Sequence, residues 1–247
     1  MSLQRLLQLP LCLYGWLATV ISVVFALLSA LLVPPRTWRE WLATFASRLP
    51  FLLTATRPSI EGLEHLPEGH SVVVANHASY IDGPLLKGVL PPRFSFVIKG
   101  EMRNIPVVHF LLRRAGARFV ERTETSASAR DARTIVRAAQ GGASLAFFPE
   151  GTFREEPGVG RFRAGAFMAA IKGGVPIVPV AITGSRHMLT CSDWMLRWSR
   201  LSIRILEPIS PDDPAFSHHR TLAEAARQRI LSVLDEPDLL EAPESAA

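Results

Sequence analysis

The pattern of apolar and polar positions divides the chain into an apolar N-terminal part and a longer alternating part. Residues 11–33 contain no charged side chain, and Pro34 and Pro35 end the run. A helix of that length spans about 35 Å, enough to cross the apolar part of a bilayer. The run therefore predicts a membrane-anchoring helix that either spans the membrane or lies in one leaflet. A secretory signal peptide is the rival interpretation, and the length of the run argues against it.

The following segment, residues 36–53, is amphipathic. Trp38, Trp41 and Phe45 recur at helical spacing, with arginines between them. Aromatic rings at headgroup level and cations facing anionic lipid are typical of an interfacial helix. An ordinary helix that packs its aromatic face on a folded domain fits the same spacing. We expect residues 1–57 to form a membrane anchor and interfacial helix.

From about residue 59, short β-rich runs alternate with helical runs, which favours an α/β fold. We expect a largely parallel mixed sheet flanked by helices, with residues 58–235 forming one domain and residues 236–247 a mobile tail. In such sheets, ligands bind beyond the carboxyl ends of the strands. Strands are predicted at 71–76, 94–98, 117–121, 144–148, 175–182 and 201–206, and helices at 125–140, 164–172 and 221–234.

Composition narrows the function classes. Hydrophobic residues make up 48% of the chain, mostly because of the N-terminal part, and the formal net charge is +5. A positive balance fits anionic lipid, anionic substrates or nucleic acid. The chain has no zinc-finger spacing and no basic-aromatic RNA-binding pattern, so we expect no nucleic-acid partner. Cys12 and Cys191 do not make a disulfide framework, and the histidines show no metal-ligand spacing, so we expect no metal.

The first motif with chemical content is His77 followed by Asp82, directly after a predicted strand. On a straight helix these side chains would point about 140° apart, so they meet only if the chain turns between them. Gly83 and Pro84 make a turn into a helix plausible. Asp82 would then orient the imidazole, leaving its second nitrogen as a base for a hydroxyl. The alternative is that Asp82 only caps a helix and His77 is a loop residue.

A second motif, residues 148–154, leaves another predicted strand into a turn. Gly151 lets backbone amides approach a ligand, Thr152 adds a hydroxyl, and the planar fork of Arg154 suits phosphate. The alternative for the same residues is a surface turn with a solvated Glu150. A further basic cluster begins at Lys99 and is either a solvated face or a cationic rim for a phosphorylated substrate. No Gly-x-Ser-x-Gly or Gly-x4-Gly-Lys motif is present, which argues against a serine nucleophile and an NTPase.

Together, these motifs resemble the glycerolipid acyltransferase family, whose members include the 1-acylglycerol-3-phosphate acyltransferases. The resemblance covers about residues 71–184. It rests on four blocks in the family's order and spacing, at residues 76–82, 99–122, 148–167 and 175–180.

The resemblance implies a membrane-anchored acyltransferase domain that moves an acyl group to the hydroxyl of a lysophospholipid. The donor would be acyl-CoA or acyl-carrier protein as co-substrate, with no other cofactor. His77 would be the general base and Asp82 its orienting partner. Glu150, Gly151, Thr152, Arg154, Lys99 and Arg122 would bind substrate. Val175, Pro176, Ile177 and Pro179 would shape the acyl side.

One position departs from the family pattern. Many members have arginine directly after Gly-Thr in the third block, whereas this chain has Phe153 there and arginine at 154. The family resemblance makes lysophosphatidate the first acceptor to consider, and this departure leaves lysophosphatidylethanolamine or an amino-acid lysolipid open. A catalytically silent lipid-binding protein is the alternative from another class. The donors and Arg36 and Arg39 after the apolar run favour a domain on the cytoplasmic face of the inner membrane.

Overall fold

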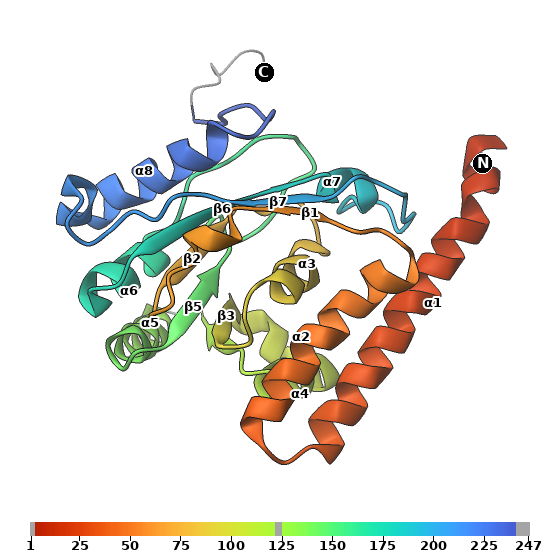
Figure 1. The fold of residues 1–247 in the computed structure, drawn as a ribbon, viewed down its shortest axis with the longest axis horizontal. Helices are drawn as coiled ribbons and strands as arrows, with labels where there is room; N and C mark the ends of the chain where they lie inside the picture. Colours follow the sequence, from red (N-terminus) through yellow and green to blue (C-terminus); the bar gives the residue numbers. More distant parts are fainter. Residues whose placement is uncertain (1–2, 122–124, 241–247) are drawn as a thin grey trace.

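The computed structural model describes residues 3–121 and 125–240 (Figure 1). The chain begins with an antiparallel pair of helices, α1 (Leu3–Leu32) and α2 (Arg36–Leu53), which lie to one side of an α/β domain. Proline at 34 and 35 accounts for the break between them, because proline lacks the amide hydrogen that a continuous helix needs. The helical pair is the predicted N-terminal element.

The domain is built on a seven-stranded sheet in the order β1-β7-β6-β2-β5-β3-β4. Neighbouring strands are parallel except β6 and β7, which are antiparallel. The predicted α/β fold with a largely parallel mixed sheet is confirmed. The strands are β1 (Ser59–Glu61), β2 (Val72–Ala75), β3 (Phe94–Lys99), β4 (Arg118–Val120), β5 (Ser144–Phe147), β6 (Ile177–Thr183) and β7 (Ser202–Ile205).

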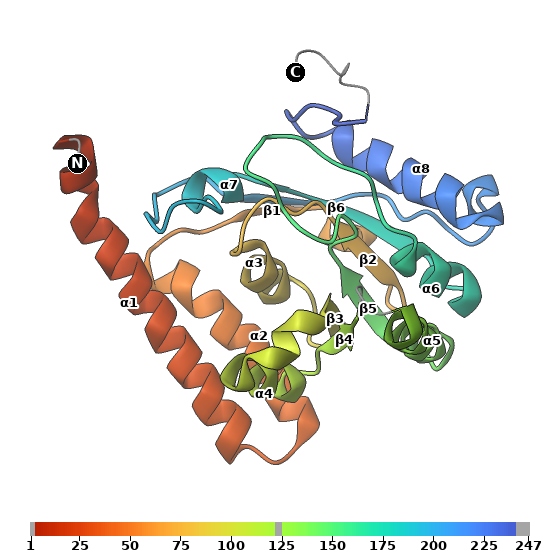
Figure 2. The ribbon, with the colours of Figure 1, turned by 180° about the vertical axis from the view of Figure 1, so that it is seen from behind.

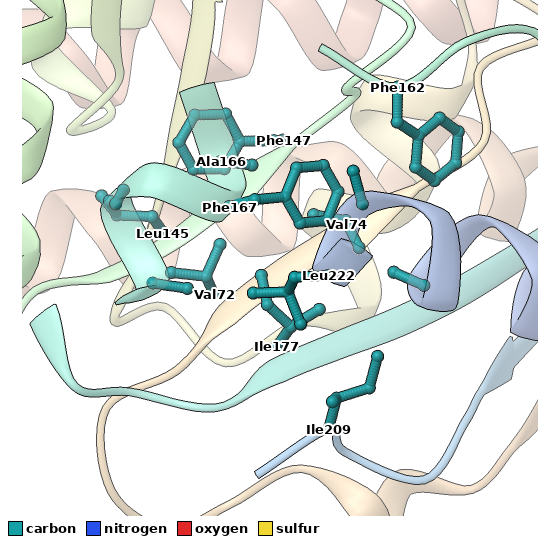
Figure 3. Close-up of a cluster of buried hydrophobic side chains, with 14 of the residues drawn as sticks. Val72, Val74, Leu145, Phe147, Phe162, Ala166, Phe167, Ile177, Ile209 and Leu222 are labelled. Carbon is teal, nitrogen blue, oxygen red and sulfur yellow. The ribbon is translucent and has the colours of Figure 1, made fainter. Parts of the chain in front are cut away.

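Helices cover both faces of the sheet (Figure 2). One face packs against α5 (Thr125–Gln140), α6 (Gly165–Gly173) and α8 (His219–Leu231), and Figure 3 shows this core around Phe167, Ile177 and Leu222. The other face packs against α3 (Asp82–Val89), α7 (Ser185–Met188) and the end of α2. Helix α4 (Pro106–Arg114) and the short turns Leu63–His65, Gly100–Asn104 and Pro214–Ser217 complete the described elements.

Helix α1 contacts the α/β domain near its middle and near its C-terminal end. Near the middle, the Trp16 indole donates to the carbonyl of Trp194 over 2.9 Å. Near the C-terminal end, the Arg114 guanidinium donates to the carbonyl of Ala30 over 2.7 Å. The C-terminal half of α1 therefore lies along the domain. Within the described residues, one helical stretch, Leu7–Leu32, is apolar and long enough to cross a bilayer.

The first residues of the expected tail contact the α/β domain. Val159 donates its amide to the carbonyl of Pro237, and Gly158 donates to the Glu236 carboxylate. Asp238 forms two hydrogen bonds with the buried guanidinium of Arg227 on α8, at 2.6 and 2.7 Å. A charged and proline-containing segment looked solvated in the sequence, but its partners lie far away along the chain.

Candidate active site

The predicted contact between His77 and Asp82 is present. His77 Nδ1 lies 2.9 Å from Asp82 Oδ2, and the same oxygen accepts the amides of Ala78 and Ser79 at 2.7 and 2.8 Å. An ionised carboxylate only accepts hydrogen bonds, so Nδ1 carries the proton and Nε2 is left basic. Asp82 is fully buried, whereas the His77 side chain retains 17% of its exposure. Asp82 thus fixes the imidazole through Nδ1, and part of the ring stays accessible to solvent.

The turn that joins these residues is held by side chains near it. Asp82 is the first residue of α3, and its amide donates to the carbonyl of Ser79. The Ser79 hydroxyl donates to the carbonyl of Leu189 over 2.6 Å. Asn76 continues the sheet by exchanging two hydrogen bonds with the backbone of Ile182, at 2.8 and 2.9 Å. Sequence reasoning gave neither Ser79 nor Asn76 a role, although Asn76 belongs to the first block.

Glu150 supports the site from the neighbouring strand. In the register of β2 and β5, Val74 pairs with Phe147, so His77 and Glu150 each lie three residues beyond this pair. Glu150 Oε1 accepts the His77 amide at 2.9 Å and Oε2 accepts the Gly160 amide at 3.0 Å. Burial raises the pKa of the Glu150 carboxyl group. Glu150, which the sequence predicted to bind substrate, therefore accepts two backbone amides and fixes the peptide of His77.

Aromatic rings enclose the imidazole of His77. Phe148 stacks on it at a centroid distance of 4.3 Å, and Phe153 meets it edge-on at 4.7 Å. Phe153 also packs against the exposed ring of Tyr80 at 4.6 Å. The phenylalanine that departs from the family pattern is thus a direct neighbour of the candidate base. Sequence reasoning noted the substitution at 153 but had no signal for this contact.

The predicted polar ligands surround the site unevenly. Thr152 and Arg154 are exposed on the turn that follows β5, and Lys99 at the end of β3 forms an ion pair with Glu101 over 2.8 Å. Arg163, to which the sequence gave no role, donates to the carbonyl of Glu150 over 3.4 Å. Arg122 lies outside the described residues. Among those residues, no group of three or more His, Cys, Asp or Glu side chains is placed to hold a metal ion.

The residues of the predicted acyl side lie away from the candidate base. Ile177 pairs with Val72, five residues before His77, which puts it about 16 Å back along the sheet. Its side chain is buried in the core between the sheet and α8 (Figure 3). The amide of Val72 also donates a hydrogen bond to the carbonyl of Pro176. Val175, Pro176 and Ile177 therefore lie at the opposite end of the strands from the candidate base, and Pro179 is buried within β6.

An apolar pocket lies on the other face of the sheet, beside the start of α3. Its volume is about 260 Å³, and residues of α1, α2, α3, α4 and β3 line it. Gly83 and Pro84, directly after Asp82, form part of its wall. Phe96 lines it too and packs 6.5 Å from the ring of Phe148, which stacks on His77. The pocket thus adjoins the candidate base through two aromatic rings.

The fold and the site define a class of protein: an α/β enzyme-like domain with a candidate histidine base, an apolar pocket and an N-terminal helical pair. Comparison with known proteins identifies the family. Residues 57–183 match the family model "Acyltransferase", so this chain belongs to the acyltransferase family. The predicted family is confirmed.

Curated relatives agree with this assignment. The chain is 31% identical over 180 residues to the chloroplast 1-acyl-sn-glycerol-3-phosphate acyltransferase LPAT1 of Arabidopsis thaliana, covering 72% of this chain and 49% of the relative. It is 32% identical over 190 residues to a lyso-ornithine lipid O-acyltransferase of Pseudomonas aeruginosa, covering 70% of each. The chain spans about half the length of the first relatives it matches.

A solved structure extends the similarity to the helical pair. The crystal structure of the 1-acyl-sn-glycerophosphate (LPA) acyltransferase PlsC from Thermotoga maritima superposes with a TM-score of 0.77 at 26% identity. The match covers 92% of this chain and 95% of that one. It therefore includes most of the N-terminal helices as well as the α/β domain.

Proposed function

We propose that this protein transfers a fatty acyl group from an acyl thioester to the free hydroxyl of a lysophospholipid. The observation that carries the proposal is the hydrogen bond from His77 to the buried Asp82 at the carboxyl end of β2. It leaves Nε2 of His77 available to a hydroxyl group. The family assignment and the apolar pocket beside this pair support the same activity.

The chemistry needs one base and little acid assistance. His77 Nε2 takes the proton of the acceptor hydroxyl as its oxygen attacks the thioester carbonyl. Asp82 stabilises the imidazolium that forms. The thiolate of the donor then leaves the tetrahedral adduct and takes the proton from the imidazolium, which restores neutral His77. Orientation of the two substrates supplies much of the remaining acceleration. The donor is acyl-CoA or acyl-carrier protein, which therefore acts as co-substrate and not as a resident cofactor.

We assign the acyl chain to the apolar pocket in place of the region around Ile177. The pocket adjoins Asp82 through Gly83 and lies beneath the helices that face lipid. Burying a methylene group is worth about 0.8 kcal/mol, so a chain of ten or more carbons gains strongly from such a pocket. Helices α1 and α2 thus serve both as the anchor and as one wall of the substrate site.

The first acceptor to test is 1-acylglycerol-3-phosphate, giving phosphatidic acid. The exposed Arg154 and Arg163, beside the turn at Glu150, are the cations we assign to its phosphate. A second acceptor class, an amino-acid lysolipid, is favoured by Phe153, which puts an aromatic ring where a cation would meet the acceptor headgroup. The similarity to the lyso-ornithine lipid enzyme makes that class worth a direct test.

We further propose that α1 lies in one leaflet and does not span the membrane. Trp16 and Ala30 are about 21 Å apart along α1, and both contact the same α/β domain. A spanning helix would place these contacts near opposite sides of the bilayer, which one compact domain cannot reach. The outward face of the pair is apolar, with Leu17, Leu28 and Trp41 more than half exposed.

The activity test is acyl transfer by the purified full-length protein. Labelled acyl-CoA and acyl-carrier protein would each be supplied with lysophosphatidate, lysophosphatidylethanolamine and lyso-ornithine lipid. We expect turnover with at least one acceptor and its loss in His77→Ala. Saturable lipid binding without turnover on any acceptor would instead identify a silent lipid-binding protein.

The placement of α1 can be tested in sealed vesicles. Cysteines introduced at the exposed positions Leu7 and Leu32, near the two ends of the helix, would be treated with a membrane-impermeant maleimide. A helix in one leaflet is labelled at both positions from the same side, which we propose is the cytoplasmic side of the inner membrane. Labelling of the two positions from opposite sides would establish a spanning helix.

A further inference from the structure

The segment that follows α8 is bound to the loop that follows the Glu150 turn. The Glu236 carboxylate accepts the amide of Gly158 over 2.9 Å, and the carbonyl of Pro237 accepts the amide of Val159 over 3.0 Å. The amide of Leu239 in turn donates to the carbonyl of Val159. We call residues 236–239 the C-terminal strap. Figure 2 shows the long loop between β5 and α6 rising beside this strap.

The side chain of Arg186 links the strap to the same loop. Its guanidinium forms an ion pair with Glu236 at 3.3 Å and donates to the carbonyls of Arg154 and Glu155. Arg186 lies on α7, directly after β6, so it is attached to the central sheet. Both members of the pair are mostly buried, with side-chain exposures of 17% and 21%. One side chain therefore fixes two successive carbonyls of the loop and the acidic group of the strap.

The close approach of strap and loop depends on backbone detail. Gly158 has a φ of +135°, and a Cβ added there would lie 2.5 Å from the Leu239 side chain. The strap itself is held to α8 by the paired hydrogen bonds between Asp238 and Arg227. These hydrogen bonds lower the pKa of Asp238 to about 2, so the strap stays attached throughout the neutral range.

Two short routes connect this assembly to His77. The first runs from Gly160, two residues after the strap contact at Gly158, through the Glu150 carboxylate to the His77 amide. The second runs from the carbonyl of Arg154, held by Arg186, to the adjacent Phe153 ring, which packs on the imidazole. The loop thus supports the candidate base at its backbone and at its ring.

We propose that Arg186 and Glu236 are positioning residues for the acyl transfer, acting through the loop at 153–160. They touch no reacting atom. They hold Phe153 against His77 and set the acceptor-side turn at Thr152, so that the acceptor hydroxyl meets Nε2. This inference rests on the proposed function for its kinetic meaning. It adds that residues 236–239, which lie outside the family resemblance at 71–184, help to position the active site.

The main test compares conservative variants of the pair in the full-length protein. Glu236→Gln keeps an oxygen for the Gly158 amide but removes the charge that pairs with Arg186. Arg186→Lys keeps a positive charge but cannot reach Glu236 and two carbonyls at once. Glu61→Gln is the control, because Glu61 forms an ion pair of 2.8 Å with Arg204 at the sheet edge, away from the loop.

We expect both variants to raise KM for the acceptor about tenfold, equal to about 1.4 kcal/mol, with KM for the donor unchanged. Amide exchange in residues 153–160 should become faster, while the melting temperature stays within a few degrees of wild type. The Glu61→Gln control should match wild type in each measurement. An unchanged acceptor KM, or an equal loss in all kinetic constants together with stability, would overturn the positioning role.

A failure of the proposed function is distinguishable from a failure of this inference. If the wild-type protein transfers no acyl group to any acceptor, the proposed function is wrong. Exchange at 153–160 and the NMR signals of the His77 ring still report the coupling. A ring signal that shifts in Glu236→Gln but not in Glu61→Gln supports the positioning of His77. Identical ring signals and exchange in both variants would overturn it.

Discussion

The imidazole of His77 and the carboxylate of Asp82 are joined at 2.9 Å through an oxygen that also accepts two backbone amides. Those amides belong to Ala78 and Ser79, in the turn between the two residues. The turn that brings the side chains together is therefore stabilised by the same oxygen that orients the base. Folding of the turn and orientation of His77 depend on one buried carboxylate.

Asp82→Asn should lower kcat about a thousandfold, within the range that general base catalysis contributes. An asparagine oxygen in the place of Oδ2 can still accept the two amides and Nδ1–H, but it carries no negative charge to stabilise the imidazolium that forms when His77 takes a proton. Turnover of labelled acyl-CoA is the measurement, with circular dichroism as the check on folding. Asp213→Asn is the matched control, since Asp213 also accepts a backbone amide, at 2.8 Å from Ala215. Activity of Asp82→Asn within tenfold of wild type would contradict the assignment.

Glu150→Gln should reduce activity about tenfold or more. A glutamine has one accepting oxygen, so either the His77 amide or the Gly160 amide would face an NH₂ group, at a cost of about 1–3 kcal/mol. The variant should act on kcat, because the peptide of the base shifts. Glu156→Gln, an exposed carboxylate on the same loop, is the control. Wild-type kcat in Glu150→Gln would show that the two amides do not position His77.

The same substitution has a pH signature. Burial raises the pKa of Glu150 above its unfolded value, so its contribution to stability is greatest below the unfolded pKa and declines as pH rises through the folded pKa. The wild type should therefore lose stability relative to Glu150→Gln as pH rises above the ordinary glutamate value of 4.5. Thermal unfolding of both proteins at a series of pH values measures the difference. A wild type that gains on the variant with rising pH would contradict a raised pKa.

The parts of the site predicted from sequence are those whose partners are close along the chain. His77 and Asp82 are five residues apart, and strand, turn and Pro84 together signal that they meet. The α/β fold was predictable for the same reason, since each strand and helix carries its own periodicity.

The parts that sequence reasoning missed depend on distant pairs. Glu150 was given to the substrate because nothing local reveals that it accepts the amides of His77 and Gly160. Ile177 was predicted to contact the acyl chain because a buried strand is apolar along its whole length. Only the register with Val72 shows which end of the strand lies at the site. Glu236 was taken for a tail residue because its partner Arg186 lies 50 residues earlier.

Ala43→Phe should shift donor preference toward shorter acyl chains. Ala43 lines the pocket from α2, and a phenyl ring there takes space from a volume of about 260 Å³. Initial rates with acyl-CoA of increasing chain length measure the profile. Val107→Phe is the control, because Val107 on α4 is exposed and outside the pocket lining. An unchanged chain-length profile in Ala43→Phe would remove this pocket as the acyl site.

Lys87→Met should stabilise the protein near neutral pH. The Lys87 amine lies in the wall of the apolar pocket, and its hydrogen bonds to the carbonyls of Pro92 and Phe94 are long, at 3.5 and 3.4 Å. Burial lowers its pKa from 10.5 to about 8. Between these values the unfolded chain binds more protons than the folded protein, so wild-type stability rises with pH by up to about 3 kcal/mol. Denaturant unfolding at pH 7, 8.5 and 10 should show the advantage of Lys87→Met shrinking as pH rises. A constant difference across that range would mean that folding does not lower the pKa of Lys87.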